Sequence, residues 1–443
     1  MLKTFPKGGV HPAEGKYSAN SVIETLSLPK TVSIPISQHI GAPSKAIVAK
    51  GDKVKVGDKI AESTGFVSAN IHSSVSGTVV KVDNVLDSTG YKRPCVIINV
   101  EEDEWNESID RSTDLKKEIS MTDKEIIQRI NESGIVGLGG ATFPAHVKLS
   151  VPDGKKIDVL IINGVECEPY LTSDHRLMLE KAEEMLVGIQ ILMKALSVNR
   201  ALIGIENNKP DAINYLQNLV KDYPGIEVHA LKVQYPQGGE KQLIKALINR
   251  EVPSGALPLN VGAVVHNVGT ALAVYDAVQK NKPLFERVVT LTGKSVKKPS
   301  NFMVRIGTPV NELIEAAGGL PEDTGKVING GPMMGKALNS LDVPVVKGTS
   351  GILIMPAELS PRKKESDCIR CAKCVSVCPQ GLEPYLLNKQ AQLEKYDNLE
   401  ASAVMDCIEC GSCAYTCPAG LPLLDYIRLG KSKVSQIIRS RKQ

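Results

Sequence analysis

A cysteine motif that occurs twice near the C-terminus constrains the fold of this chain most strongly. The pattern C-x2-C-x2-C-x3-C-P begins once at residue 368 and again at residue 407. This spacing is typical of chains that bind two cubane 4Fe–4S clusters, in which the fourth cysteine of each copy reaches across to the other cluster. Only a compact unit over residues 361–443 brings the two copies together, so we expect a separate iron–sulfur domain there.

The crossed arrangement predicts which cysteines share a cluster. Structural zinc is the alternative, but zinc sites usually take four ligands from paired CxxC motifs, without the proline-linked fourth cysteine. We interpret the isolated Cys95 and Cys167 as buried small apolar side chains. The predicted ligands are Cys368, Cys371, Cys374 and Cys417 for cluster 1, and Cys378, Cys407, Cys410 and Cys413 for cluster 2.

A glycine-rich run, GIVGLGGATFPAHVK at residues 134–148, is the candidate for a further cofactor. Clusters accept electrons one at a time, whereas NADH donates two, so electron transfer from NADH requires a flavin. Bare backbone of this kind often cradles a phosphate. The run is not a dinucleotide fingerprint, because Thr142 stands where that motif needs its last glycine.

The chain pattern predicts a multidomain α/β protein. Short β-type runs over 43–82 resemble the lipoyl carrier sandwich, although the stretch TGFVSAN lacks the lysine that carries a cofactor there. Alternating strands and helices follow and indicate a Rossmann-like, mostly parallel sheet. The next segment resembles an SLBB β-grasp domain, and a helical ferredoxin domain ends the chain. The expected boundaries are 1–100 for the N-terminal segment and sandwich, 101–130 for a linker, 131–283 for the flavin domain, 284–360 for the SLBB domain and 361–443 for the ferredoxin domain.

The composition of the chain argues against nucleic acid as a partner and against a membrane-spanning segment. The net charge is only +4 and aromatic residues make up 4% of the chain, so neither a basic field nor a base-stacking surface for nucleic acid is expected. No apolar run approaches the ~20 residues of a membrane-spanning helix, and the first residues do not resemble a signal peptide. We therefore expect a cytoplasmic protein, or one that docks on a membrane through a partner.

Several motifs in order resemble the C subunit of Rnf electron-transport complexes. They are HPAEGK, GLGGATFP, NGVECEPY, YPQGGEKQLI and the two cysteine motifs, spread over residues 11–418. The central motifs also resemble the NADH-oxidising flavoprotein subunit of respiratory complex I. Four positions depart from the complex I pattern: Leu138 replaces an arginine, Val165 an aspartate, and Lys241 and Gly269 replace glutamates.

The resemblance implies a binding site for FMN and NAD(H) and no catalytic side chain, because the flavin itself accepts the hydride. Gly137, Gly139 and Gly140 would lie along the flavin, with Lys148 at its phosphate or ring. Asn163 would contact the ring edge, and Glu168 the dinucleotide ribose. The remaining implied cofactor-binding residues are Glu166, Gly239 and Glu240, and, at the FMN phosphate, Asn267 and Thr270.

The implied function is that of a peripheral subunit, on the cytoplasmic face of the cell membrane, of a ferredoxin:NAD oxidoreductase coupled to Na⁺ or H⁺ transport. Hydride would pass between NAD(H) and FMN, and single electrons through two 4Fe–4S clusters. The implied partners are the other Rnf subunits, both membrane subunits and a ferredoxin-like iron–sulfur subunit. Two alternatives remain open: a cobalamin reductase of the propanediol-utilisation type, and a flavin-free electron relay, which the departures at Leu138 and Val165 suggest.

Overall fold

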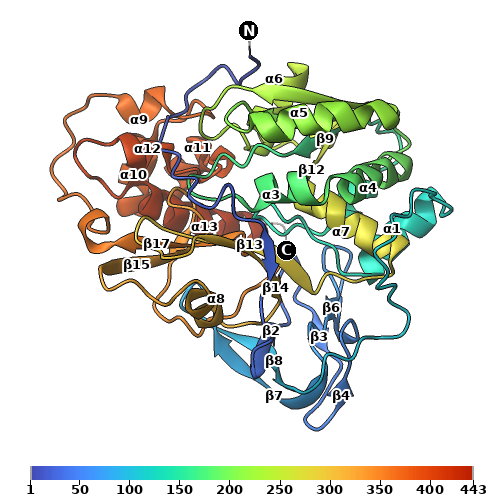
Figure 1. Cartoon of the computed structure of the whole chain (residues 1–443). Coiled ribbons are helices and arrows are strands. Elements are labelled where there is room, and N and C mark those ends of the chain that lie inside the picture. The colour runs from blue at the N-terminus through green and yellow to red at the C-terminus, as the bar shows by residue number, and fades with distance from the viewer. Residues whose placement is uncertain (1, 442–443) are drawn as a thin grey trace.

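A four-stranded parallel sheet positions most of the predicted flavin residues. In the computed structural model, which describes residues 2–441, its strands lie in the order β11-β10-β9-β12 (Figure 1). All three neighbouring pairs are parallel, which confirms the predicted α/β pattern. The strands are apolar and mostly buried on both faces, as strands covered by helices on either side must be. They are β9 (Val159–Asn163), β10 (Ala201–Glu206), β11 (Ile226–Leu231) and β12 (Ala263–Asn267).

Helices cover both faces of this sheet. One face packs against α1 (Asp123–Glu132), α3 (Ser173–Glu180), α4 (Ala182–Ala195), α5 (Pro210–Leu219) and α7 (Val268–Gln279). The other face packs against α6 (Glu240–Ile248). Helix α1 begins inside the segment expected to be a linker, where Thr122 and Glu125 form a capping box. Its Ile126 and Ile130 are buried in the core of this unit.

The N-terminal β unit is a small antiparallel sandwich, as expected for residues 43–82. Its interior is filled by aliphatic side chains such as Ile34, Ile60 and Ile98, which are fully buried. One sheet has the order β2-β8-β7-β4 and the other β3-β5-β6. The strands are β2 (Thr31–Pro35), β3 (Lys45–Ala46), β4 (Lys53–Val54), β5 (Lys59–Glu62), β6 (Ile71–His72), β7 (Gly77–Leu86) and β8 (Lys92–Val100).

A mixed six-stranded sheet with one helix follows the flavin domain in sequence. Its order is β1-β14-β13-β17-β15-β16, and β1 comes from the N-terminal segment to pair in parallel with β14. Helix α8 (Val310–Ala316) buries its apolar side against the sheet. The strands are β1 (Ile23–Thr25), β13 (Glu286–Thr292), β14 (Ser300–Arg305), β15 (Thr324–Asn329), β16 (Lys336–Ala337) and β17 (Gly351–Pro356).

The cysteine-rich unit is helical, and the segment between the two cysteine motifs forms α10 and α11, which confirms the predicted helical insert. These helices pack on α13 around Leu387, Leu399 and Ile427. The helices are α9 (Lys373–Ser376), α10 (Pro384–Gln392), α11 (Tyr396–Ala401), α12 (Ser412–Thr416) and α13 (Leu423–Ser440). Short 3-10 helices occur at Val220–Asp222, Pro258–Val261, Ala357–Leu359 and Val404–Asp406.

Residues 3–18, here called the N-terminal strap, connect the flavin domain with the cysteine-rich unit. In Figure 1 the dark blue chain runs between the green and the orange-red parts of the molecule. Lys3 pairs in parallel with Leu231 at the edge of the sheet. The Gly9 amide donates to the Val377 carbonyl at 2.9 Å, one residue before a predicted cluster ligand. The strap thus holds together two units that lie far apart in the sequence.

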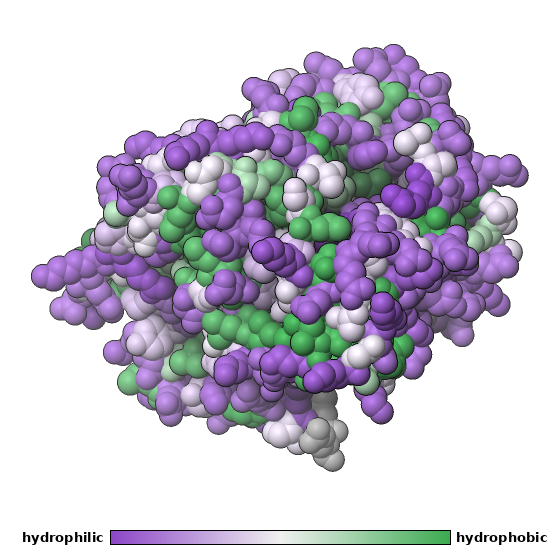
Figure 2. All heavy atoms as spheres, turned by 60° about the horizontal axis from the view of Figure 1, so that its bottom comes forward, coloured by the Kyte–Doolittle hydropathy of each residue, from purple (hydrophilic) through white to green (hydrophobic). Residues whose placement is uncertain are grey.

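The face of the molecule shown in Figure 2 is predominantly polar. In Figure 2 hydrophilic residues cover most of the visible face, and apolar residues gather in small groups between them. Over residues 2–441, no helix combines the length and the apolar character that crossing a membrane requires.

Candidate flavin and cluster sites

The glycine-rich run forms a closed loop between α1 and α2 (Ala145–Leu149). Its arms are pinned at the base, because the Gly137 amide donates to the Phe143 carbonyl at 2.9 Å. The tip, Gly139 to Ala141, is exposed. Gly140 has a φ of +111°, a conformation that favours glycine. The loop therefore presents bare backbone at the surface from a fixed base.

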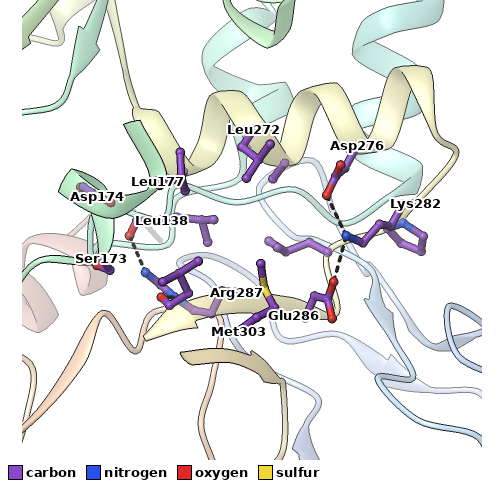
Figure 3. Close-up of a pocket in the computed structure, with 15 residues that line it drawn as sticks. Leu138, Ser173, Asp174, Leu177, Leu272, Asp276, Lys282, Glu286, Arg287 and Met303 are labelled. Carbon is purple, nitrogen blue, oxygen red and sulfur yellow. Dashed lines mark hydrogen bonds and ion pairs between the residues drawn. The ribbon is translucent and has the colours of Figure 1, made fainter. Parts of the chain in front are cut away.

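Two side chains hold this loop from beneath. The Leu138 amide donates to the Thr270 hydroxyl at 2.9 Å, and the Arg287 guanidinium donates to the Leu138 carbonyl at 3.3 Å (Figure 3). Arg287 comes from β13 and is buried, and this burial lowers its pKa to about 10. Leu138, which stands where the related pattern has an arginine, is itself buried. The Arg287 guanidinium thus supports the backbone of the loop from behind.

Asn163 and Asn267 stand side by side at the carboxyl ends of β9 and β12, where they are register partners. The Asn267 side chain caps α7 by accepting the Gly269 amide at 2.8 Å, and its Nδ2 donates to Asp174 at 2.6 Å. The Asn163 Nδ2 donates to the Gly238 carbonyl at 2.8 Å. Strand order reverses at this point, and ligands of doubly wound sheets bind at such switch points.

Lys148 is a residue of α2 whose side chain reaches the start of α6. Its ammonium group donates to Glu240 Oε1 at 2.6 Å and to the Val265 carbonyl at 3.0 Å. Gly239 is the N-cap residue of α6, so the free amides of that helix face the same region. The neighbouring His266 is buried, its Nε2 has no hydrogen-bond partner among residues 2–441, and burial lowers its pKa to about 3.

The two acidic residues after β9 are engaged with backbone amides. The Glu166 carboxylate accepts the amides of Asp174 at 2.8 Å and His175 at 3.2 Å, and so caps α3. The Glu168 carboxylate accepts the amides of Met333 at 3.2 Å and Met334 at 2.6 Å, in the loop GGPMMG. Burial raises the pKa of Glu168 to about 7. Contact of either residue with a cofactor stays a prediction.

The donor groups around the loop suit the charge of FMN. The amides at the starts of α6 and α7 and the Lys148 ammonium suit a phosphate, and the amide side chain of Asn163 suits a polar ring edge. An added Cβ at Gly139 would lie 3.5 Å from the Asn267 Cβ, an ordinary van der Waals distance. The loop backbone therefore packs directly on the strand end.

A cavity behind the loop is a separate feature. Figure 3 shows it between α7 and β13, with Asp174 and Arg287 at one end and Lys282 between Asp276 and Glu286 at the other. The Lys282 ammonium lies 3.0 Å from Asp276 and 2.9 Å from Glu286. The volume of this cavity, about 40 Å³, is far below that of a cofactor pocket. The candidate flavin site is therefore the open face of the loop.

Two proximities between the cysteine motifs agree with the crossed arrangement, and the ligand sets themselves stay a prediction. Burial raises the pKa of the Cys413 thiol, and the proximity of Cys410, Cys407 and Cys378 raises it further. Cys378 thus lies beside the second motif, although it belongs to the first. In the same way, burial and the proximity of Cys417 raise the pKa of the Cys374 thiol.

Exposure varies within the cluster 1 set, because Cys368 and Cys371 are exposed and Cys417 is buried, and in the cluster 2 set Cys410 is buried. Among residues 2–441, no three His, Cys, Asp or Glu side chains converge closely enough to hold one metal ion. A cubane takes each thiolate at a different iron and so spaces its ligands more widely. The cysteine sets are assigned from motif spacing and proximity.

Family models match successive parts of the chain. Residues 3–103 match the RnfC barrel sandwich hybrid domain, and residues 130–276 match the Nuo51 FMN-binding domain. Residues 288–337 match the SLBB domain, and residues 360–418 match a 4Fe-4S dicluster domain. Fold, site and matches together define a flavin- and iron–sulfur-dependent oxidoreductase, with FMN and 4Fe–4S clusters as its cofactors.

Curated relatives identify the family. The chain is 49% identical over 89% of its length to the C subunit of the proton-translocating ferredoxin:NAD(+) oxidoreductase complex of Clostridium ljungdahlii, of which the match covers 86%. It is 44% identical over 97% of its length to the Na(+)-translocating counterpart of Acetobacterium woodii, with 96% of that protein covered. The chain belongs to the family of C subunits of ion-translocating (Rnf) oxidoreductase complexes.

A solved structure shares the fold at low sequence identity. An NAD⁺-reducing NiFe hydrogenase in its H2-reduced state superposes with a TM-score of 0.52 at 18% identity. The match covers 72% of this chain and 66% of the hydrogenase chain. The likeness extends beyond the flavin domain and supports the arrangement of the fold.

Sequence reasoning missed Arg287, Asp174 and the partners of Tyr235. Arg287 lies 149 residues from Leu138 in sequence, so no local motif connects the two. Tyr235 hydrogen-bonds the cysteine-rich unit and makes no contact with Lys148 or Asn163 among the hydrogen bonds described. The signal in the sequence is its position shortly before the GGEK motif.

Proposed function

We propose that this chain is the peripheral electron-transfer subunit of a membrane-bound ferredoxin:NAD oxidoreductase, coupled to ion transport by other subunits. The relatives named above are subunits of such complexes. One observation carries the proposal for this chain: the glycine-rich loop, Lys148, Asn163 and Asn267 converge at the switch point of a sheet that contacts the double cysteine motif. A position on the cytoplasmic face of the membrane follows from this role.

The proposed FMN site uses the predicted residues in three ways. Gly137, Gly139 and Gly140 give the flavin close access to backbone, and Lys148 with the α6 and α7 amides neutralises the phosphate. When bound, FMN accepts a hydride from NADH and releases electrons singly. Asn163 and Asn267 orient the cofactor through their amide groups. Two carboxylates fix the segments that border the site. Glu166 accepts the Asp174 amide at the start of α3, and Glu168 accepts the Met334 amide in the loop GGPMMG.

The proposed order of electron transfer places cluster 2 next to the flavin. Its ligand Cys410 accepts a hydrogen bond from the flavin domain at its carbonyl, and Gln242 of α6 donates to the Pro379 carbonyl at 3.4 Å, directly after Cys378. By contrast, Cys368 and Cys371 of cluster 1 are exposed. Cluster 1 therefore faces the iron–sulfur partner subunit.

The finer domain assignments belong to the same proposal. We assign 1–100 to a lipoyl-like sandwich, 131–283 to the FMN and NADH domain, 284–360 to the SLBB β-grasp domain and 361–443 to the ferredoxin domain. The segment 101–130 connects the first two and contributes α1 to the core of the second. The antiparallel sandwich, the parallel sheet and the helical insert support this division.

Anaerobic purification with reconstitution tests the proposal. We expect about eight irons and one FMN per chain, and bleaching of both chromophores by NADH. Eight irons without flavin, and no reduction by NADH, would instead identify a flavin-free relay. Fast reduction of cob(II)alamin without any membrane partner would identify the cobalamin reductase.

Replacement of Lys148 by alanine tests the FMN site. The variant should lose most of its FMN and keep both clusters, because the ammonium group sits at the α6 start and far along the chain from the cysteines. Lys156→Ala is the matched control, since Lys156 is an exposed lysine in the loop that follows α2. Full FMN occupancy in Lys148→Ala would contradict the assigned site.

A further inference from the structure

We propose that Tyr235 is a positioning residue for electron transfer between the flavin and cluster 2. Its hydroxyl group holds a ligand of cluster 2 in place and raises the reduction potential of that cluster. The inference rests on the proposed function above. Tyr235 lies between β11 and α6, with 2% of its surface exposed. Its hydroxyl donates to the backbone carbonyl of Cys410, a predicted ligand of cluster 2, at 2.8 Å.

The surroundings of Tyr235 keep this hydrogen bond away from water. A tyrosine hydroxyl, with an ordinary pKa of about 10, is protonated at neutral pH and can donate. The ring packs in an apolar cluster to which both the flavin domain and the cysteine-rich unit contribute. The members of this cluster are Val10, Tyr235 and Cys410, with Cys167, Met333, Val377 and Ile408 packed against them.

The backbone at Tyr235 is fixed on the flavin side as well. Its amide and carbonyl both pair with Val10 of the strap, at 2.9 and 2.8 Å. Three residues further on, the Gly238 carbonyl accepts a hydrogen bond from the side-chain Nδ2 of Asn163. The next residue, Gly239, is the N-cap residue of α6. One short segment, residues 235–240, therefore contacts the cluster ligand at one end and the flavin site at the other.

The hydroxyl also acts on the cluster electrostatically. A donor aimed at the peptide of a ligand places positive charge near the thiolate, which favours the more negative, reduced cluster. Loss of the hydroxyl should therefore lower the reduction potential of cluster 2 and leave cluster 1 unchanged. It should also slow electron transfer from the flavin, because the buried Cys410 carbonyl loses its partner and the contact relaxes.

A second set of contacts keeps the units together when the hydroxyl is removed. Arg428 of α13 donates to the Met334 carbonyl at 3.2 Å and pairs with Glu409 at 3.2 Å. Met334 in turn donates to Glu168 of the flavin domain. The cysteine-rich unit therefore stays docked without the Tyr235 hydroxyl, and a variant at this position reports on the hydroxyl itself.

Tyr235→Phe in the reconstituted full chain tests the proposal. We expect unchanged FMN and iron, and a lower potential for the cluster whose EPR signal is broadened by the flavin semiquinone. In stopped-flow experiments with NADH, flavin reduction should keep its rate. Cluster reduction should slow by about 2- to 10-fold, the factor to which one net hydrogen bond corresponds.

Tyr275→Phe is the matched control. Tyr275 is equally buried, and its hydroxyl accepts the Lys116 amide at 3.1 Å on the other side of the flavin domain. This variant should keep the wild-type potentials and rates. Wild-type potential and rate in fully loaded Tyr235→Phe, or the same change in both variants, would overturn the proposal. Absence of flavin from the wild-type protein would contradict the proposed function instead.

Discussion

Lys347 is a buried lysine that has no carboxylate partner among residues 2–441. With 1% of its surface exposed, it donates through its Nζ to the carbonyls of Asn70 at 3.0 Å and Gly134 at 2.7 Å. These carbonyls belong to the β-sandwich and to the base of the glycine-rich loop. Burial lowers the pKa of Lys347 to about 7. The Lys347 side chain therefore links the mixed sheet to the β-sandwich and to the glycine-rich loop. Because its pKa is lowered, the stability that it contributes depends on pH.

The stability contributed at Lys347 should rise with pH. Below about pH 7 both the folded and the unfolded chain hold its proton. Between about 7 and 10.5 only the unfolded chain holds it, so unfolding takes up a proton and the free energy of unfolding increases with pH. Over the full window the gain is on the order of a few kcal/mol.

Thermal unfolding of wild type and Lys347→Met between pH 6.5 and 9.5 measures this effect. The difference in unfolding temperature between the two proteins should grow in favour of wild type as the pH rises. A difference that stays constant over this range would show that Lys347 keeps its ordinary pKa in the folded protein.

Individual side chains were predictable where their partners are close in sequence. The spacing of the cysteine motifs predicted that Cys378 joins the second motif. Cys378 lies near Cys413 in the structure, and its role as a ligand there stays a prediction. The partners of Glu168 and Leu138 were not predictable. Met334 and Arg287 approach them from the mixed sheet, through tertiary contacts that leave no local pattern.

Helices α4 and α7 are in close contact at Gly188. A Cβ at this position would collide with the Ala271 carbonyl of α7. The first turn of α7 carries Asn267 and Thr270, which cap the helix and hold the glycine-rich loop. A single glycine in α4 therefore sets the position of one wall of the flavin site.

Gly188→Ala should destabilise the protein and weaken FMN binding. Alanine is favoured over glycine inside a helix by about 1 kcal/mol, so propensity alone predicts the opposite sign. Overpacking of this kind costs about 1–3 kcal/mol and displaces α7. Chemical unfolding and FMN titration measure both effects, with Gly65→Ala as control, because the nearest atom to its new Cβ is 3.8 Å away. Unchanged FMN affinity in Gly188→Ala would show that α7 does not move.

Elements were predictable where periodicity is strong. The alternation of apolar strands and helices predicted the parallel sheet correctly. Helix α1 was not anticipated, although its capping box, Thr122 to Glu125, is visible in the sequence. The high charge of residues 101–126 concealed it, because only Ile126 and Ile130 of this helix are buried.

At the scale of the whole molecule, the N-terminal strap joins units that are separate in the sequence pattern. Beyond its contacts with Leu231, Tyr235 and Val377, its Lys16 ammonium donates to the carbonyls of Glu166 at 2.9 Å and Leu171 at 2.7 Å. The domain order was predictable from composition and motifs. The strap was not, because its backbone pairing depends little on side-chain identity.

Deletion of residues 2–12 should loosen the boundary between the flavin domain and the cysteine-rich unit. The amides of Lys232 and Tyr235 donate to the strap at 3.0 and 2.9 Å, so their hydrogen–deuterium exchange should accelerate. Exchange in β9 serves as the internal reference, and FMN should remain bound because Lys16 is retained. Unchanged exchange over residues 230–238 would contradict a fastening role for the strap.

The strap also bears on the order in which the molecule is completed during synthesis. Gly9 leaves the ribosome long before its partner Val377. The contact therefore forms only after the flavin domain and the mixed sheet have emerged, together with most of the first cysteine motif. The contact between Gly9 and Val377 thus forms only once translation has reached the cysteine-rich unit.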